Sequence, residues 1–146
     1  MGLHIPSLVH QTLENSCWAA VLECWSRNDP QMPQGLRQQD LIDRWGEGPT
    51  GGITPEIKIP QIARAYGLRL PDGRFRSVVP YLQSHLDTSY LFCASSVPGS
   101  AFMHSVLIYR VRANNVDAMD PDRGRYHTWH IADFENLGAH IVMHRP

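Results

Sequence analysis

Apolar residues follow different patterns in the two halves of the chain. From Ser16 to Arg27 nearly every position is apolar or small, and only Glu23 and Ser26 interrupt the run. A helix that is apolar on most sides is typical of a central, buried position. We expect Ser16 to cap this helix, because its hydroxyl can accept a hydrogen bond from a first-turn N–H. Further helices are expected at Leu36–Trp45, from Thr54-Pro55 to Tyr66 with a second possible start at Pro60, and at Ser77–Leu86.

The second half is rich in the β-branched and aromatic residues that favour strands. Strands are expected at Tyr90–Ser95, His104–Arg112, Val116–Met119, Tyr126–His130 and Ala139–His144, with a short helical turn at Ala132–Asn136. Asn114-Asn115 is a turn signal that would join the second and third strands in a hairpin. Helices followed by antiparallel strands predict an α+β fold, with N-terminal helices packed on a C-terminal sheet. The length of 146 residues indicates one domain, 1–146.

Composition excludes several classes of protein. Hydrophobic residues make up 42% of the chain and charged residues 18%, which is a globular composition. The net charge of −1 provides no attraction to nucleic acid or to an anionic membrane. The N-terminus lacks the basic and apolar regions of a signal peptide, so we expect synthesis in the cytoplasm. The histidines and cysteines show no metal-binding spacing, so neither a metal nor another cofactor is expected.

Cys17 is the strongest candidate for chemistry. It lies in the expected first turn of the buried helix, where unpaired N–H groups and the helix dipole favour a thiolate. A thiolate is the nucleophile that acyl transfer requires. The alternative is a core cysteine, an interpretation that fits Cys24 and Cys93, which fall inside an expected helix and an expected strand.

Three other residues complete a possible catalytic set around Cys17. Gln11 precedes the cysteine by six residues, and its amide can donate to an oxyanion together with the Cys17 N–H. His104 begins an expected strand, and Asp120 follows it by sixteen residues, before a proline. A carboxylate at that point can accept from the imidazole and select its tautomer. Taken singly, His104 is also explained as a strand-end histidine, and Asp120 as a turn residue.

The expected hairpin leaves the third member of this set open. A simple turn at Asn114-Asn115 would not place Asp120 opposite His104. A bulge, or a turn displaced toward Val111–Ala113, would be needed to bring them together. Asp117 is therefore a second candidate for the carboxylate.

These segments resemble a known family. QTLENSCWAA is similar to the active-site entry of papain-like cysteine peptidases, with Gln11 and Cys17-Trp18 in register. HSVLIYRVRANNVDAMDPDRG resembles the His and Asp-Pro segments of the bacteriocin-processing peptidase domains of ABC exporters, and also those of papain-like bacterial effector proteases. GITPEIKIPQIARAYGLRL resembles a helix of the same branch. The resemblance implies a papain-like cysteine protease fold and the catalytic set Cys17, His104, Asp120 and Gln11.

The resemblance also implies how substrate is bound. It places Gly51, Gly52 and Trp18 beside the cleft, where a glycine pair lets a substrate backbone pair as an added strand. The alternative for the glycines is an ordinary flexible turn. Trp129 and Trp45 are expected in the core, with the cleft wall as the alternative. The bacteriocin-processing branch cuts after paired glycines, which implies the same preference here.

The predicted function is hydrolysis of peptide bonds in a protein or peptide substrate. A protease of this size without a signal peptide suggests a bacterial toxin or effector domain, delivered by a specialised secretion system and restrained by an immunity protein or inhibitor that covers the cleft. Two alternatives remain. One is a glutamine deamidase, transglutaminase or cell-wall amidase on the same scaffold. The other is a catalytically inactive papain-like module that only binds a partner.

Overall fold

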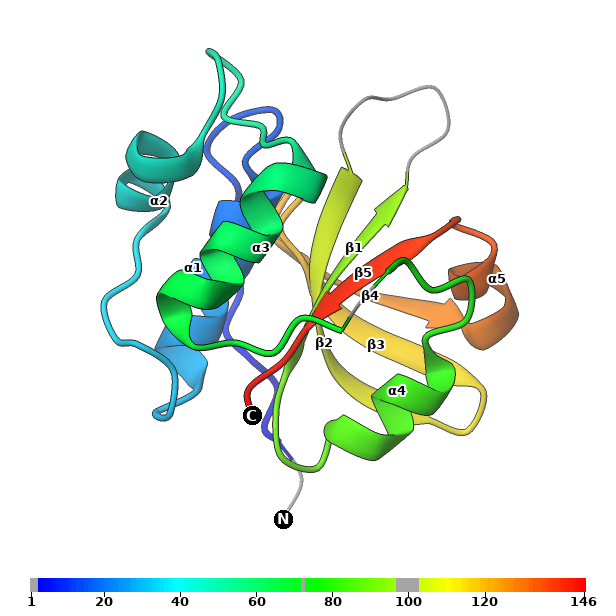
Figure 1. Cartoon of the computed structure of the whole chain (residues 1–146). Coiled ribbons are helices and arrows are strands. Elements are labelled where there is room, and N and C mark those ends of the chain that lie inside the picture. Colours follow the sequence, from blue (N-terminus) through cyan, green and yellow to red (C-terminus); the bar gives the residue numbers. More distant parts are fainter. Residues whose placement is uncertain (1–2, 72, 97–102) are drawn as a thin grey trace.

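Helices and one antiparallel sheet make up the computed structural model, which describes residues 3–71, 73–96 and 103–146 (Figure 1). The helices are α1 (Cys17–Asn28), α2 (Gln38–Trp45), α3 (Pro55–Tyr66), α4 (Val79–His85) and α5 (Ile131–Glu135). The strands are β1 (Leu91–Ser96), β2 (Met103–Arg112), β3 (Asn115–Asp120), β4 (Arg125–His130) and β5 (His140–Met143). Each element lies within two residues of its expected bounds, and α3 continues through Pro60. Among the described residues, no helix is long and apolar enough to cross a membrane.

The sheet has the order β4-β3-β2-β1-β5, and every neighbouring pair is antiparallel. The outer edge of β5 is covered by the segment that follows α3. Arg69 exchanges both backbone hydrogen bonds with His144, and Phe75 does the same with His140. This pairing satisfies backbone groups that an edge strand would otherwise expose.

Both faces of the sheet are largely buried along β1, β2, β3 and β5, and side chains that alternate along these strands enter two apolar clusters. On β2, Leu107 and Tyr109 face the cluster formed with α1, α2 and α3. Val106 and Ile108 face the opposite cluster, to which α4 and α5 contribute Leu82 and Phe134. The helical first half therefore packs on one face, and the two short helices cover the other (Figure 1).

The central helix is α1, as the apolar run predicts: ten of its residues are buried. The expected cap by Ser16 is wrong, because its side chain makes no capping hydrogen bond to the helix. The Ser16 hydroxyl accepts from the Leu13 N–H at 3.0 Å and donates to the Leu13 carbonyl at 3.2 Å. The hydroxyl thus closes the turn that leads into the helix.

The β2–β3 hairpin turns one residue earlier than expected, at Ala113-Asn114, since Arg112 pairs with Asn115. The register also shifts between Ile108 and Arg110, where β2 carries an extra residue. The sequence analysis required one of these two departures, and the structure has both. Together they move the far end of β3 toward the beginning of β2.

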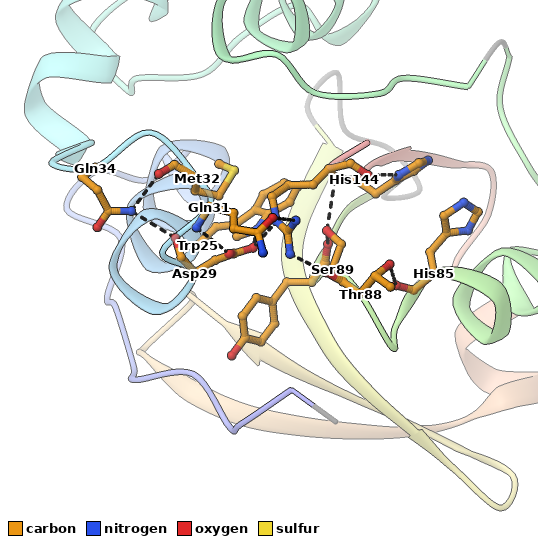
Figure 2. Close-up of polar contacts among 11 residues, drawn as sticks. Trp25, Asp29, Gln31, Met32, Gln34, His85, Thr88, Ser89 and His144 are labelled. Atoms are coloured by element: carbon orange, nitrogen blue, oxygen red, sulfur yellow. Dashed lines mark hydrogen bonds and ion pairs between the residues drawn. The ribbon is translucent and has the colours of Figure 1, made fainter. Parts of the chain in front are cut away.

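A buried ion pair joins the C-terminus to the helical half. Arg145 Nε donates to Asp29 Oδ2 at 2.5 Å, and the Arg145 guanidinium also donates to the Thr88 carbonyl. Trp25 Nε1 donates to the same Asp29 oxygen at 3.2 Å, and Ser89 Oγ accepts from the Arg145 N–H at 3.1 Å. Figure 2 shows Asp29 and Trp25 on one side of this network and Thr88 and Ser89 on the other.

Candidate active site

Cys17 lies at the first residue of α1, against an open stretch of the β2 backbone. The β2–β3 pairing ends at Leu107 and Met119, so the β2 groups beyond that point have no partner on β3. Cys17 occupies this place: its Sγ accepts from the Ser105 N–H at 3.4 Å and lies 3.7 Å from the Met103 carbonyl oxygen. A backbone N–H directed at the sulfur and the start of a helix both favour negative charge there.

His104 and Asp120 are in direct contact. His104 Nε2 lies 2.8 Å from Asp120 Oδ1, and the carboxylate side chain is only 3% exposed. The register explains the contact, because extending the Leu107–Met119 pairing by one residue sets Asp120 beside Val106, on the same face as His104. Such diagonal neighbours on an antiparallel pair lie within reach of long side chains. Asp120 Oδ1 also accepts from the Asp122 N–H at 3.0 Å, which orients the carboxylate.

The charge state of His104 follows from these contacts. Burial opposes protonation, but hydrogen bonds to Asp120 and to Cys17, together with the charges of both groups, raise the pKa of His104 from 6.5 to about 10. Since Nε2 faces Asp120, the other ring nitrogen, Nδ1, is the one left for the thiol. Burial acts to raise the pKa of Asp120, but the hydrogen bond and charge of His104, the Asp122 N–H and the Arg125 charge together outweigh it, so the pKa is lowered. The structure therefore brings together a cysteine, an imidazole and a carboxylate in the order that acyl transfer requires.

Asp117, the second candidate for the carboxylate, lies elsewhere on β3 and has other partners. Its Oδ2 accepts from Arg110 Nε at 2.8 Å and from Arg112 Nε at 2.7 Å, and Thr128 Oγ1 donates to its Oδ1 at 2.6 Å. Burial acts to raise the pKa of Asp117, and these hydrogen bonds and charges outweigh it, lowering the pKa to about 2. Asp117 stabilises the hairpin and takes no part in orienting His104.

Gln11 lies beside Asp120 through its backbone, since the Gln11 N–H donates to the Pro121 carbonyl at 3.0 Å. Its side-chain amide donates to the carbonyls of Leu13 at 3.1 Å and Glu14 at 2.8 Å, and its Oε1 is buried without a partner among the described residues. Both amide hydrogens are thus in use. Donation to an oxyanion, the predicted role of Gln11, requires one of these bonds to be released.

Gln38 is a supporting residue that sequence analysis missed. This buried side chain accepts from the Thr12 N–H at 3.1 Å and donates to the His10 carbonyl at 2.8 Å. It therefore clamps the backbone on both sides of Gln11. Only the tertiary structure reveals this role, because Gln38 belongs to another helix, 27 positions further along the chain.

Gly51, Gly52 and Trp18 form a buried unit next to Cys17. Trp18 Nε1 donates to the Gly51 carbonyl at 2.8 Å, and the Glu47 N–H donates to the Gly52 carbonyl at 2.7 Å. Gly51 has a φ of +71°, and a Cβ there would lie 2.9 Å from Leu13 Cδ1. The loop is an ordered turn packed against the segment that precedes the cysteine. Both glycine carbonyls are occupied and Trp18 is buried, so a role of the three in binding substrate stays a prediction.

Among known proteins, only solved structures show a similarity to this chain. No protein-family model matches the chain, and no curated protein sequence matches it. Seven chains of solved structures match. One is the peptidase domain of Streptococcus ComA, a bifunctional ABC transporter involved in a quorum-sensing pathway. Its TM-score is 0.70 at 17% sequence identity, and the alignment covers 97% of this chain and 99% of that domain. The chain has a papain-like peptidase fold.

Within this papain-like fold, the other two cysteines lie in the core. Burial raises the pKa of the Cys24 thiol to about 12 and that of the Cys93 thiol to about 12. Among the described residues, neither thiol is hydrogen-bonded to His104 or Asp120, and all three cysteines are free thiols. Their interpretation as core cysteines is confirmed.

Two further residues of β4 lie beside the His104–Asp120 pair. His127 Nδ1 is 3.6 Å from Asp120 Oδ2, and the His127 ring stacks on Trp129 with centroids 3.9 Å apart. Trp129 and Trp45 both pack against a core cluster, as expected, and Trp129 also lines a cavity next to His104. The sequence signal for His127 and Trp129 was their spacing of two positions on one expected strand, which places both side chains on the same face of the sheet. Among the described residues, no group of three or more His, Cys, Asp or Glu side chains is arranged to bind a metal.

Proposed function

We propose that the chain is a cysteine peptidase that hydrolyses peptide bonds through Cys17, His104 and Asp120. The observation that carries the proposal is the position of the His104 ring, hydrogen-bonded to Asp120 through Nε2 and next to the Cys17 sulfur. The raised pKa of His104 favours an imidazolium at neutral pH. The proposed nucleophile is the Cys17 thiolate paired with this imidazolium.

The reaction then proceeds in two stages. The thiolate attacks the peptide carbonyl carbon, a C–S bond forms, and the carbonyl electron pair moves to oxygen. When the tetrahedral intermediate collapses, the C–N bond breaks and the leaving amine takes the His104 proton. Water next attacks the thioester while His104 accepts its proton, which releases the carboxylic acid and the thiolate. Throughout, Asp120 keeps Nε2 as the donor nitrogen and stabilises the imidazolium.

Negative charge on the carbonyl oxygen needs hydrogen-bond donors. The first N–H groups of a helix have no intrahelical partner, so the backbone N–H of Cys17 is available at the start of α1. Gln11 is the proposed second donor, after its amide releases the carbonyl of Leu13 or Glu14. Removing one oxyanion donor costs about 100-fold to 1,000-fold in turnover in enzymes of this kind.

A comparison of two cysteine variants tests this proposal. Cys17 is 4% exposed, so a small reagent such as iodoacetamide is required, and the alkylated residue is identified by mass spectrometry. We expect alkylation of Cys17 at neutral pH, no peptide hydrolysis by Cys17→Ala, and hydrolysis by Cys24→Ala. Loss of activity in folded Cys24→Ala with full activity in Cys17→Ala would overturn the assignment.

The products separate the proposal from its alternatives. Shortened peptides indicate a peptidase, whereas ammonia release from intact chains indicates a deamidase or transglutaminase. An unreactive Cys17 in folded protein would favour a module that only binds a partner. A peptide library provides the cleavage site in the same experiment.

We further propose, from the resemblance of the His104–Gly124 segment, that cleavage follows paired glycines. The physical argument is that glycines lie flat in a narrow cleft that any Cβ would block. Equal cleavage after replacement of both residues by alanine or leucine would contradict it. The toxin or effector role, the delivery route and an immunity protein or inhibitor stay predictions of the sequence.

A further inference from the structure

A cavity of about 270 Å³ lies directly beside His104 and Asp120. It opens on the face of the sheet that carries α5, and Cys17 does not line it. Its apolar surface comes from Val106, Trp129, Phe134 and Leu137. The volume is slightly below the about 300–1,000 Å³ typical of small-molecule pockets, which suits a single side chain.

The two sides of the scissile bond can be assigned from the alternation along β2. Met103, Leu107 and Tyr109 contact the cluster around α1, whereas His104 and Val106 face the opposite side. In acyl transfer by a thiol, the imidazolium protonates the leaving amine. The leaving part of the substrate therefore lies on the His104 side, next to this cavity.

Aromatic side chains of the cavity wall pack against one another. Trp129 stacks on His127 at 3.9 Å between centroids and packs on Phe134 at 5.5 Å. Phe134 is fully buried and stacks in turn on His140 at 4.8 Å. Polar residues complete the lining: Asp122 and Arg125 are exposed and form the rim, whereas Ser95 is buried and Ser96 and His127 are partly buried. Most of the lining surface is nevertheless apolar, which favours an apolar side chain.

We propose that this cavity binds the side chain of the first residue after the cut and selects a large apolar or aromatic one. The inference rests on the proposed peptidase function, and it adds the specificity of the leaving-group side. Trp129, Phe134 and Leu137 are the residues that determine it. Gain or loss of a single methylene group in such a pocket changes the rate about 10-fold to 200-fold, so a large side chain should have an effect of at least that order.

The test compares two peptides, acetyl-Leu-Ala-Gly-Gly-Phe-Ala-Ala-amide and its analogue with alanine in place of phenylalanine. We expect kcat/KM for the first to exceed that for the second at least about tenfold in the wild type. Leu137→Trp fills the cavity and should bring this ratio near one, and Leu137→Phe serves if the tryptophan variant unfolds. Both peptides are assayed with the same protein, so a variant with a general loss of activity lowers both kcat/KM values and leaves their ratio unchanged.

Leu70→Trp is the matched control. It fills a cavity of about 250 Å³ between α3 and residues that include Leu70 and Pro71, and neither His104 nor Asp120 lines this cavity. The ratio should stay at the wild-type value in this variant. A wild-type ratio within about twofold of one, or a ratio that Leu137→Trp does not change, would overturn the inference.

A binding measurement distinguishes failure of the cavity inference from failure of the proposed peptidase function. The probes are the leaving fragments Phe-Ala-Ala-amide and Ala-Ala-Ala-amide, titrated into the Cys17→Ala protein by NMR. Tighter binding of the phenylalanine fragment by about tenfold, lost in Cys17→Ala/Leu137→Trp, supports the cavity even if no peptide is cleaved. Equal binding of both fragments counts against the cavity whether or not the protein is a peptidase.

Discussion

At the scale of single residues, two aspartates three positions apart on β3 have different roles. Both are buried, at 1% exposure for Asp117 and 2% for Asp120, so each needs partners that offset the loss of water. Asp117 obtains them from two arginines, and Asp120 obtains them mainly from His104. The identity of the partner decides the function: guanidinium groups stay charged, whereas an imidazole can exchange a proton.

The pKa of His104 provides the first prediction. Asp120→Asn removes the carboxylate charge and leaves the burial that favours neutral imidazole, so the pKa of His104 should fall from about 10 by about 1–3 units. NMR titration of ¹³C-labelled histidine measures this, with His104→Gln to assign the signal. The alkaline decline of kcat/KM should move to lower pH with it. Asp117→Asn is the control, and an equal shift in that variant would contradict the role of Asp120.

The same shift has a consequence for stability. A pKa raised in the folded state means that the protonated imidazole stabilises the fold fully below pH 6.5, the ordinary value for histidine. This contribution is lost as the pH rises through about 10. In Asp120→Asn the loss should be complete at lower pH, because the folded-state pKa is lower.

At the scale of elements, the sequence predicted which segments form helices and strands but not how β2 and β3 pair. The apolar run of α1 and the β-branched residues of β2 are strong local signals. The turn was misplaced because Asn114-Asn115 matches turn statistics, whereas the structure gives the positive φ of +48° to Ala113. The register shift between Ile108 and Arg110 also has no local signal, since neither residue is a glycine. For this reason the choice between Asp117 and Asp120 required the structure.

Ala113 provides the second prediction. A left-handed backbone costs a non-glycine residue about 1–2 kcal/mol, and glycine avoids that cost but loses more entropy on folding. Ala113→Gly should therefore increase the free energy of unfolding by about 0.5–1 kcal/mol, measured by urea denaturation. Ala132→Gly, at an exposed position in α5, should instead decrease it by about 0.5–1 kcal/mol. Destabilisation by Ala113→Gly would show that the turn is not strained.

At the scale of the whole molecule, the helical half and the sheet meet at both ends of α1. Cys17 at its first residue contacts β2, and Asp29, directly after its last residue, binds Arg145 beyond β5. The helix is therefore anchored to the sheet at each end, and the cysteine keeps its place against β2 only while the two halves stay together. The Arg145–Asp29 ion pair at the last turn of α1 therefore also helps to keep Cys17, at the first turn, in contact with β2.

The Arg145–Asp29 pair provides the third prediction. Both side chains are largely buried, at 12% and 4% exposure, so Arg145→Met leaves an uncompensated carboxylate and should lower the free energy of unfolding by about 3–5 kcal/mol. Arg145→Met/Asp29→Asn should recover part of the loss, because asparagine carries no charge and can still accept from Trp25.

Arg27→Met is the matched control: Arg27 pairs with Glu23 but is 58% exposed, so the free energy of unfolding should change by no more than about 1 kcal/mol. Urea denaturation measures the wild type and the three variants. A loss below about 1 kcal/mol for Arg145→Met would mean that water solvates the Asp29 carboxylate in place of the arginine. The pair anchors α1 as a whole, so in the Arg145→Met protein the preferential alkylation of Cys17 over Cys24 should disappear at the urea concentration at which this variant unfolds.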